Sequence, residues 1–204
     1  MKERPILFSA PMVRAILAGT KTQTRRVVKP HRSDDSFVLE DHGNGWWPYR
    51  SEDGESSVML DGCEHRFNCP YGQPGDRLYV KETWSHDGSG GPPIYMADLC
   101  ERDYPGVPCE HGPARWSPSI HMPRWASRIT LEITGVRVER LQDISEQDAM
   151  AEGVEPYRLP CHPQREALRH VDGFCAVWES IYGPGSWERN PWVWAITFTR
   201  VATK

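Results

Sequence analysis

The amino-acid sequence predicts an α+β fold, with strands toward both ends of the chain and two helices between its later strands. Apolar residues alternate in three runs, at residues 76–84, 129–138 and 192–198. Such alternation is typical of strands with one buried face. Helical signals occupy residues 145–153 and about 164–182. This arrangement favours an α+β fold around a small barrel or a strongly curved sheet.

Composition favours one domain that spans residues 1–204. The chain has 204 residues, of which 38% are hydrophobic, enough for one well-buried core. Its net charge of −4 argues against a protein that coats long polyanions, but it allows a local basic cleft. No run of about 18 apolar residues and no signal-peptide core are present, so we expect a cytoplasmic protein outside the membrane.

A short strand and a short helix are predicted near the amino terminus. Residues 6–8 are apolar, and Ser9, Ala10 and Pro11 form a helix start with proline in the first turn. Gly19 supplies a residue that can adopt the left-handed conformation and end the helix.

The segment that follows, residues 19–26 (GTKTQTRR), is the strongest functional signal. It lies within residues 5–33, which contain no Asp or Glu. A solvated basic face is one explanation. Threonines between the cations favour an anion or acyl site, because hydroxyl groups donate hydrogen bonds and act as nucleophiles. Its candidate residues are Lys21, Thr22, Thr24, Arg25 and Arg26.

Two regions rich in Gly, Pro, Ser and Asp are predicted to be long loop insertions, at about residues 31–62 and 85–118. Trp46, Trp47 and Tyr49 lie in the first. Exposure of these aromatic rings would be costly, so we expect part of this insertion to fold back onto the body.

The strand at residues 76–84 places Glu82 on the same face as the apolar Leu78 and Val80. A buried carboxylate needs a cation, several donors or a proton. Glu82 is therefore either half of a structural ion pair with an arginine or an active-site acid.

The second and third strand runs differ in their patterns. Apolar residues occupy odd positions from Ile129 to Ile133 and even positions at Val136 and Val138. We interpret this as a strand pair, with a bulge or tight bend at Gly135. Residues 192–198 form a closing strand with an aromatic face.

Of the two predicted helices, the first is short, with Ser145 as its N-cap and Gly153 at its end. Glu152 lies in its last turn, where the helix dipole raises a carboxyl pKa and favours a general acid. A solvent-facing glutamate is the alternative. The second helix presents one apolar face, formed by Phe174, Val177, Trp178 and Ile181.

A second basic stretch, residues 111–131, also lacks Asp and Glu. Arg124 and Arg128 flank Trp125 there, a combination that suits a stacked nucleobase with a phosphate held nearby. The alternative is a Trp-anchored loop whose arginines are solvated or pair with Glu82. Asn190 either reads a base edge or shapes the turn before the last strand.

The cysteines do not predict a metal site. Cys63, Cys69, Cys100 and Cys109, with nearby histidines, offer ligands for zinc, but none has the CxxC spacing. We expect thiols, no metal and no cofactor.

Several motifs together resemble the ASCH domain family, a group within the PUA-like superfold of small β-barrels. These are residues 19–26, residues 74–78 (PGDRL), residues 144–153 and the final aromatic strand. The resemblance covers about half of the chain and excludes both insertions. It is closest to larger members, which are often encoded by phages or prophages.

The resemblance implies an enzyme, because compact bacterial ASCH members are amidohydrolases that remove the acetyl group from N4-acetylcytidine. Their catalytic lysine, threonine and glutamate match Lys21, Thr24 and Glu152. Thr24 would then attack the acetyl carbonyl and Lys21 would accept its proton. Glu152, or alternatively Glu82, would protonate the leaving nitrogen.

Two other functions stay open. One is a noncatalytic module that binds RNA or a modified base, and the other is a ribonuclease. In every case the expected partner is a modified nucleoside or a single-stranded nucleic acid. The sequence indicates no oligomeric state.

Overall fold

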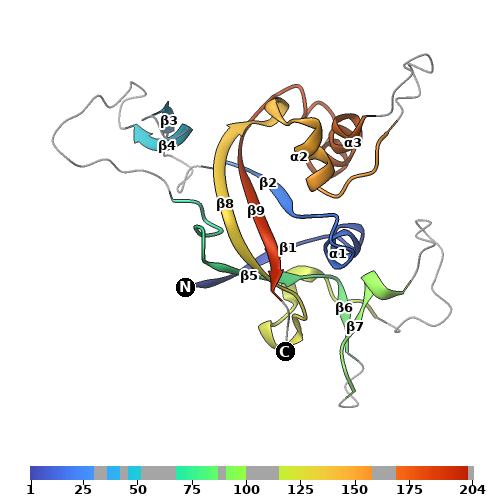
Figure 1. The fold of residues 1–204 in the computed structure, drawn as a ribbon. Coiled ribbons are helices and arrows are strands. Elements are labelled where there is room, and N and C mark those ends of the chain that lie inside the picture. Colours follow the sequence, from blue (N-terminus) through green and yellow to red (C-terminus); the bar gives the residue numbers. More distant parts are fainter. Residues whose placement is uncertain are drawn as a thin grey trace.

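The computed structural model describes residues 1–29, 36–41, 46–51, 68–86, 91–99, 115–157 and 169–201 (Figure 1). Its strands are β1 Glu3–Leu7, β2 Gln23–Val27, β3 Ser36–Asp41, β4 Trp46–Ser51, β5 Arg77–Lys81, β6 Trp84–Ser85, β7 Ile94–Tyr95, β8 Thr130–Arg140 and β9 Trp192–Val201. Its α-helices are α1 Ala10–Leu17, α2 Glu146–Ala151 and α3 His170–Tyr182. Short 3-10 helices cover Met96–Asp98, Ser119–His121, Arg124–Ala126 and Leu141–Asp143. The predicted α+β class is confirmed.

Strand β8 organises the main sheet. It pairs antiparallel with β9 from Thr130 to Arg140. On its other side, β5 pairs with its beginning, and Trp46 of β4 pairs with Val138. β1 adds to β5 in parallel and β2 adds to β9 in antiparallel. Among the described strands no ladder joins β1 to β2, so the predicted closure into a barrel is not seen.

Residues 130–140 form one strand, so the predicted strand pair is wrong, whereas the predicted bulge at Gly135 is confirmed. A shift of register between Ile133 and Gly135 inserts one extra residue into β8. This bulge moves the buried positions from odd to even numbers, and Ile133 and Val138 both face the core. A bulge therefore produces the same change of pattern as a turn between two strands.

The two predicted insertions are not loops throughout. Strands β3 and β4 pair with each other within the first, and β6 and β7 form a separate two-stranded sheet within the second. Trp47 packs against the main core, with its ring centroid 5.8 Å from that of Trp194. The predicted return of the first insertion onto the body is confirmed at this residue.

Two apolar clusters stabilise the fold. The larger one packs α1, through Val13 and Ile16, against the sheet. The smaller one packs Phe174 and Trp178 of α3 beside α2 and β9. In Figure 1, α2 and α3 lie together near one end of the long β8 and β9 strands.

The second predicted helix is shorter at its start than expected, and its apolar face is incompletely buried. Arg169 is extended, so α3 begins at His170, and residues 164–168 lie outside the described part of the chain. Ile181 is 54% exposed, contrary to its predicted place on the buried face. No helix within the described residues has the length and hydrophobicity needed to cross a membrane.

Candidate functional site

The segment that carries Lys21 is fixed between the ends of two helices. Gly19 has a φ of +80° and turns the chain out of α1. The carbonyl oxygen of Ala15 then accepts hydrogen bonds from the backbone nitrogens of Thr20 and Lys21. Thr22 donates its backbone N–H to Ala151 O at the end of α2, over 2.8 Å. These bonds place Lys21 directly against the C-cap of α2.

Lys21 binds Glu152 twice. Its Nζ lies 2.7 Å from Glu152 Oε2 and 2.8 Å from the Glu152 carbonyl oxygen. The two side chains are only 1% and 3% exposed. The structure therefore brings together two of the four residues that the sequence predicts as catalytic candidates, Lys21 and Glu152.

Burial lowers the pKa of Lys21 below its ordinary value of 10.5. The Glu152 carboxylate opposes this shift, while the positive charges of Arg26 and Arg25 add to it. Desolvation is the largest of these effects on the pKa of Lys21. A lysine in such surroundings is well placed to exchange a proton.

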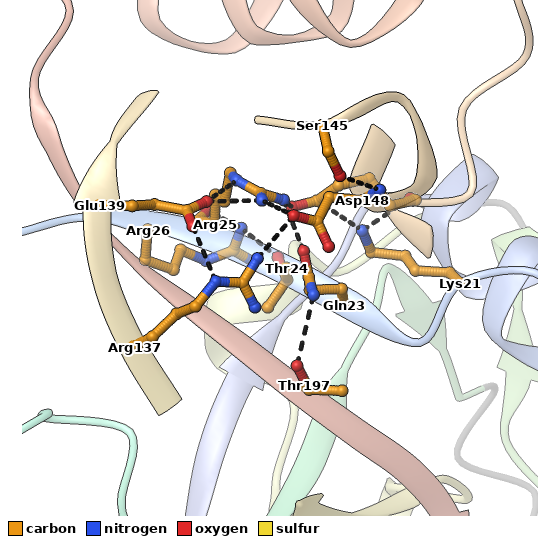
Figure 2. A network of polar contacts seen from close by, with 11 residues as sticks. Lys21, Gln23, Thr24, Arg25, Arg26, Arg137, Glu139, Ser145, Asp148 and Thr197 are labelled. Carbon is orange, nitrogen blue, oxygen red and sulfur yellow. Dashed lines mark hydrogen bonds and ion pairs between the residues drawn. The ribbon is translucent and has the colours of Figure 1, made fainter. Parts of the chain in front are cut away.

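Arg25 also contacts Glu152 and joins it to an extended polar network, in which Figure 2 labels Arg25, Glu139 and Asp148. Its Nη1 lies 3.2 Å from Glu152 Oε1 and 2.7 Å from Gln23 Oε1. Its Nη2 lies 2.6 Å from Glu139 Oε1 and 3.1 Å from Asp148 Oδ2. The Arg25 side chain is 0% exposed and its polar contacts are with Gln23 and the carboxylates of the network, so its predicted role in binding substrate stays a prediction.

The alternation of β2 separates Arg25 from Thr24 and Arg26. Gln23 and Arg25 point toward α2, whereas Thr24 and Arg26 point toward the end of β1. There Arg26 Nη1 donates to Thr24 Oγ1 over 3.0 Å. Among the described residues no hydrogen bond joins Lys21 Nζ to Thr24 Oγ1.

The ring of Phe8 connects the two sides of the site. Lys21 Nζ lies 5.6 Å from its centroid, and Arg26 Cζ lies 5.3 Å from it. Lys21, Thr24 and Glu152 are all buried, whereas Arg26 is half-buried. A ligand that approaches Thr24 from solvent must therefore displace a side chain at this boundary. The Thr22 side chain is exposed.

Glu82 belongs to a different cluster. It is 1% exposed, and its carboxylate accepts two hydrogen bonds from Arg128, from Nε at 3.0 Å and from Nη2 at 3.1 Å. Arg128 also binds Asp98. Burial raises the pKa of Glu82, and Arg128 opposes the increase. No hydrogen bond or ion pair in the described part of the chain joins Glu82 to Lys21, so the structural ion pair is the alternative that the geometry favours.

The remaining predicted binding residues also lie outside the Lys21 network. Arg124 makes a bidentate pair with Glu3. Trp125 is 65% exposed, with its ring nearly perpendicular to those of Trp84 and His86. Asn190 has a φ of +42°, and its side chain accepts a hydrogen bond from the Gln142 backbone, which shapes the turn before β9.

The structure offers no metal centre within its described residues, where no three His, Cys, Asp or Glu side chains gather suitably. Cys69 is a buried free thiol whose pKa is raised by burial. Cys63, Cys100 and Cys109 lie outside the described residues.

A cavity of about 500 Å³ lies apart from this network. Its lining includes Arg4, Trp47, Asp76 and Val136, and Cys69 is the one predicted site residue that borders it. The Lys21 network holds buried side chains of opposite charge in contact with one another. This arrangement is typical of active sites, so we take the network as the candidate site.

Several members of the network were missed from the sequence: Gln23, Arg137, Glu139 and Asp148. Arg137 donates to both Glu139 and Asp148, each over 2.7 Å. The backbone nitrogen of Asp148 donates to Ser145 Oγ, the predicted N-cap. The signal that could have indicated the acidic residues is a buried arginine on the same strand face as a polar glutamine. A buried positive charge requires carboxylate partners.

No protein-family model, curated protein or solved structure matches this chain. The resemblance to ASCH domains therefore rests on the sequence motifs alone.

Proposed function

We propose that the protein is an amidohydrolase that removes an acyl group from the exocyclic amine of a nucleobase, with N4-acetylcytidine or a related modified base as substrate. Membership of the ASCH family and a PUA-like fold are part of this proposal. The observation that carries it is the buried contact of 2.7 Å between Lys21 Nζ and Glu152 Oε2. Lys21 lies three residues before Thr24 in the chain. An acid, a base and a hydroxyl nucleophile are what this reaction needs.

The contact between Lys21 and Glu152 supports acid–base chemistry because one proton can serve both groups. A shift of this proton along the hydrogen bond converts the ion pair into a neutral amine and a carboxylic acid. Burial favours the neutral amine, as the lowered pKa of Lys21 indicates. Arg25 Nη1 lies 3.2 Å from the other carboxylate oxygen of Glu152, so this carboxyl group contacts two cationic side chains.

The reaction then proceeds in two halves. Thr24 Oγ1 attacks the acetyl carbon and its proton passes to Lys21. The C–N bond breaks, Glu152 gives its proton to the exocyclic nitrogen, and cytidine leaves. Water attacks the acetyl ester, Glu152 takes the water proton, and the protonated Lys21 returns a proton to Thr24. Acetic acid leaves and both groups regain their starting protonation.

This mechanism requires a rearrangement when substrate enters. Thr24 Oγ1 is bound by Arg26 and Lys21 Nζ is bound by Glu152. The proposed reaction needs a change of rotamer at Thr24 or Lys21 that brings the hydroxyl group within reach of the amine. Catalytic hydrogen bonds of this kind often tighten only in the substrate complex.

The test is incubation of the purified protein with N4-acetylcytidine, with release of cytidine and acetate followed by chromatography. We expect turnover in the wild type and a loss of at least about 10³-fold in Lys21→Ala and Thr24→Ala. Thr20→Ala is the matched control, because Thr20 is an exposed hydroxyl of the same segment that binds only the end of α1. If the wild type and the three variants are all folded and have equal turnover, Lys21 and Thr24 do not have the catalytic roles assigned to them.

A noncatalytic nucleic-acid-binding module is the second candidate, and the exposed ring of Trp125 favours it. A base stacked on an aromatic side chain contributes about 1–3 kcal/mol. Absence of turnover, together with salt-dependent binding of a single-stranded oligonucleotide that Trp125→Ala weakens, would support this candidate instead. Shortening of the oligonucleotide would indicate a ribonuclease.

A further inference from the structure

We propose that Arg26 forms an anion subsite beside Thr24 and, in the reaction proposed above, donates hydrogen bonds to the oxyanion. The anion subsite stands on the charge and contacts of Arg26, whereas the oxyanion role rests on the proposed function.

The charge of Arg26 lacks an acidic partner among the described residues. Its hydrogen bonds go to neutral oxygens: Thr24 Oγ1 at 3.0 Å, Arg25 O at 3.2 Å and Leu7 O at 2.9 Å. The adjacent Arg25 differs, because it contacts three carboxylates. A half-buried guanidinium bound only to neutral acceptors favours an additional anion.

The location of Arg26 suits an oxyanion. When Thr24 Oγ1 attacks an acyl carbon, the oxygen that becomes negative is separated from Oγ1 by that single carbon atom. The guanidinium that already contacts Oγ1 is therefore within reach of the new charge. Donors that are in place before the charge develops need little reorganisation.

Independent contacts hold the guanidinium at this place. Nη2 donates to the carbonyl oxygen of Leu7, at the end of β1. Phe8 is 3% exposed, and its ring packs against the guanidinium group, with the ring centroid 5.3 Å from Arg26 Cζ. The Arg26 side chain thus spans from β2 to β1, where no backbone ladder joins these strands.

Arg26 also lies where a ligand must enter. Thr24 is 1% exposed, whereas Arg26 is half-buried and Tyr182 is 36% exposed. Burial raises the pKa of Tyr182, and the positive charge of Arg26 opposes the increase. An incoming acyl oxygen would replace Thr24 Oγ1 as the acceptor for Arg26 Nη1.

The first test measures the anion subsite without turnover. Trifluoroacetate, a fluorinated relative of acetate, is titrated with the protein and its ¹⁹F line broadening is followed. We expect binding by the wild type and about tenfold weaker binding by Arg26→Gln. Arg200→Gln is the control, because Arg200 is exposed and donates to Leu17 O. Equal binding by Arg26→Gln and the wild type, or no binding by either, overturns the subsite.

The second test measures the oxyanion role. Arg26→Gln is expected to lower kcat for N4-acetylcytidine by about 10²–10³-fold with little change in KM. Guanidinium chloride at millimolar concentration should restore part of the activity of Arg26→Ala, which a purely structural role would not allow. A raised KM with kcat unchanged overturns the oxyanion role. Absence of turnover in the wild type removes the proposed function, and the titration still decides the anion subsite.

Discussion

Lys21 Nζ contacts both the carboxylate and the backbone carbonyl of Glu152, although 131 positions separate the two residues. The carboxylate contact provides a proton partner, and the carbonyl contact places a cation at the end of α2, where the helix dipole favours positive charge. One side chain therefore joins the chemistry of the site to the termination of a helix.

Gly153→Ala should displace Lys21. Gly153 has a φ of +72°, and an added Cβ would lie 2.8 Å from Lys21 Cβ and 2.9 Å from Ala15 Cβ. We expect a loss of about 2–4 kcal/mol in the free energy of unfolding, measured with urea, and a decrease in turnover. Gly75→Ala is the control, because Gly75 has a φ of +88° and open space around it. A similar loss for both variants would contradict the role of this contact.

Arg25→Met should destabilise the protein far more than Arg137→Met. Both arginines contact Glu139 and Asp148, but the Arg25 side chain is 0% exposed and that of Arg137 is 42% exposed. Removal of Arg25 leaves the buried carboxylate of Glu152 and two partly buried carboxylates with less compensation, at a cost of about 3–5 kcal/mol. Arg137→Met should cost about 1 kcal/mol or less. Denaturant unfolding at pH 7 measures both, and equal losses would be inconsistent with the network.

Arg128→Met should make stability depend on Glu82 protonation. Burial raises the pKa of Glu82 above its ordinary value of 4.5, and loss of Arg128 removes the opposing effect. A carboxyl group whose pKa is raised by folding contributes stability below its ordinary value, and this is lost as pH rises through the folded value. We therefore expect a larger deficit at pH 8 than at pH 5 in urea unfolding. The double variant Glu82→Gln with Arg128→Met should remove this pH dependence.

Asp76→Asn should change the acid sensitivity of the fold. Hydrogen bonds from the Lys2 backbone nitrogen and the Arg4 side chain lower the pKa of Asp76 from 3.8 to about 2. Such a carboxylate contributes stability above pH 3.8 that is lost as pH falls toward 2. The variant should be less stable at pH 6 and have a shallower decline between pH 4 and pH 2. Glu132→Gln is the control, since Glu132 is 43% exposed and lies 3.8 Å from Arg77.

Local signals made much of the fold predictable. The cap at Ser145, the turns at Gly19 and Gly153 and the alternation in β5 each depend on a few adjacent residues, and the structure has them where the sequence indicates. At residues 129–138 the predicted bulge at Gly135 is present, but one strand replaces the predicted strand pair, because a bulge and a turn leave the same parity change in a sequence.

The site was predictable only where its residues are adjacent in the chain. Lys21, Thr24 and Arg26 belong to one segment, but the partners of Arg25 come from β8 and α2. Such contacts depend on how distant strands and helices meet. Trp125 is exposed and Arg124 is paired with Glu3, although both lie in one basic stretch. The neighbouring residues do not indicate which of the two side chains makes a contact.

The pairing of β2 with β9 has a consequence for how the protein is made. Among the described strands β9 is the sole ladder partner of β2, and Gln23 pairs with Thr197. During synthesis, the strand that carries Thr24 and Arg26 cannot pair until more than a hundred further residues have left the ribosome. Contacts this distant in sequence slow folding, so the nascent chain carries an unpaired, cationic edge for most of its translation.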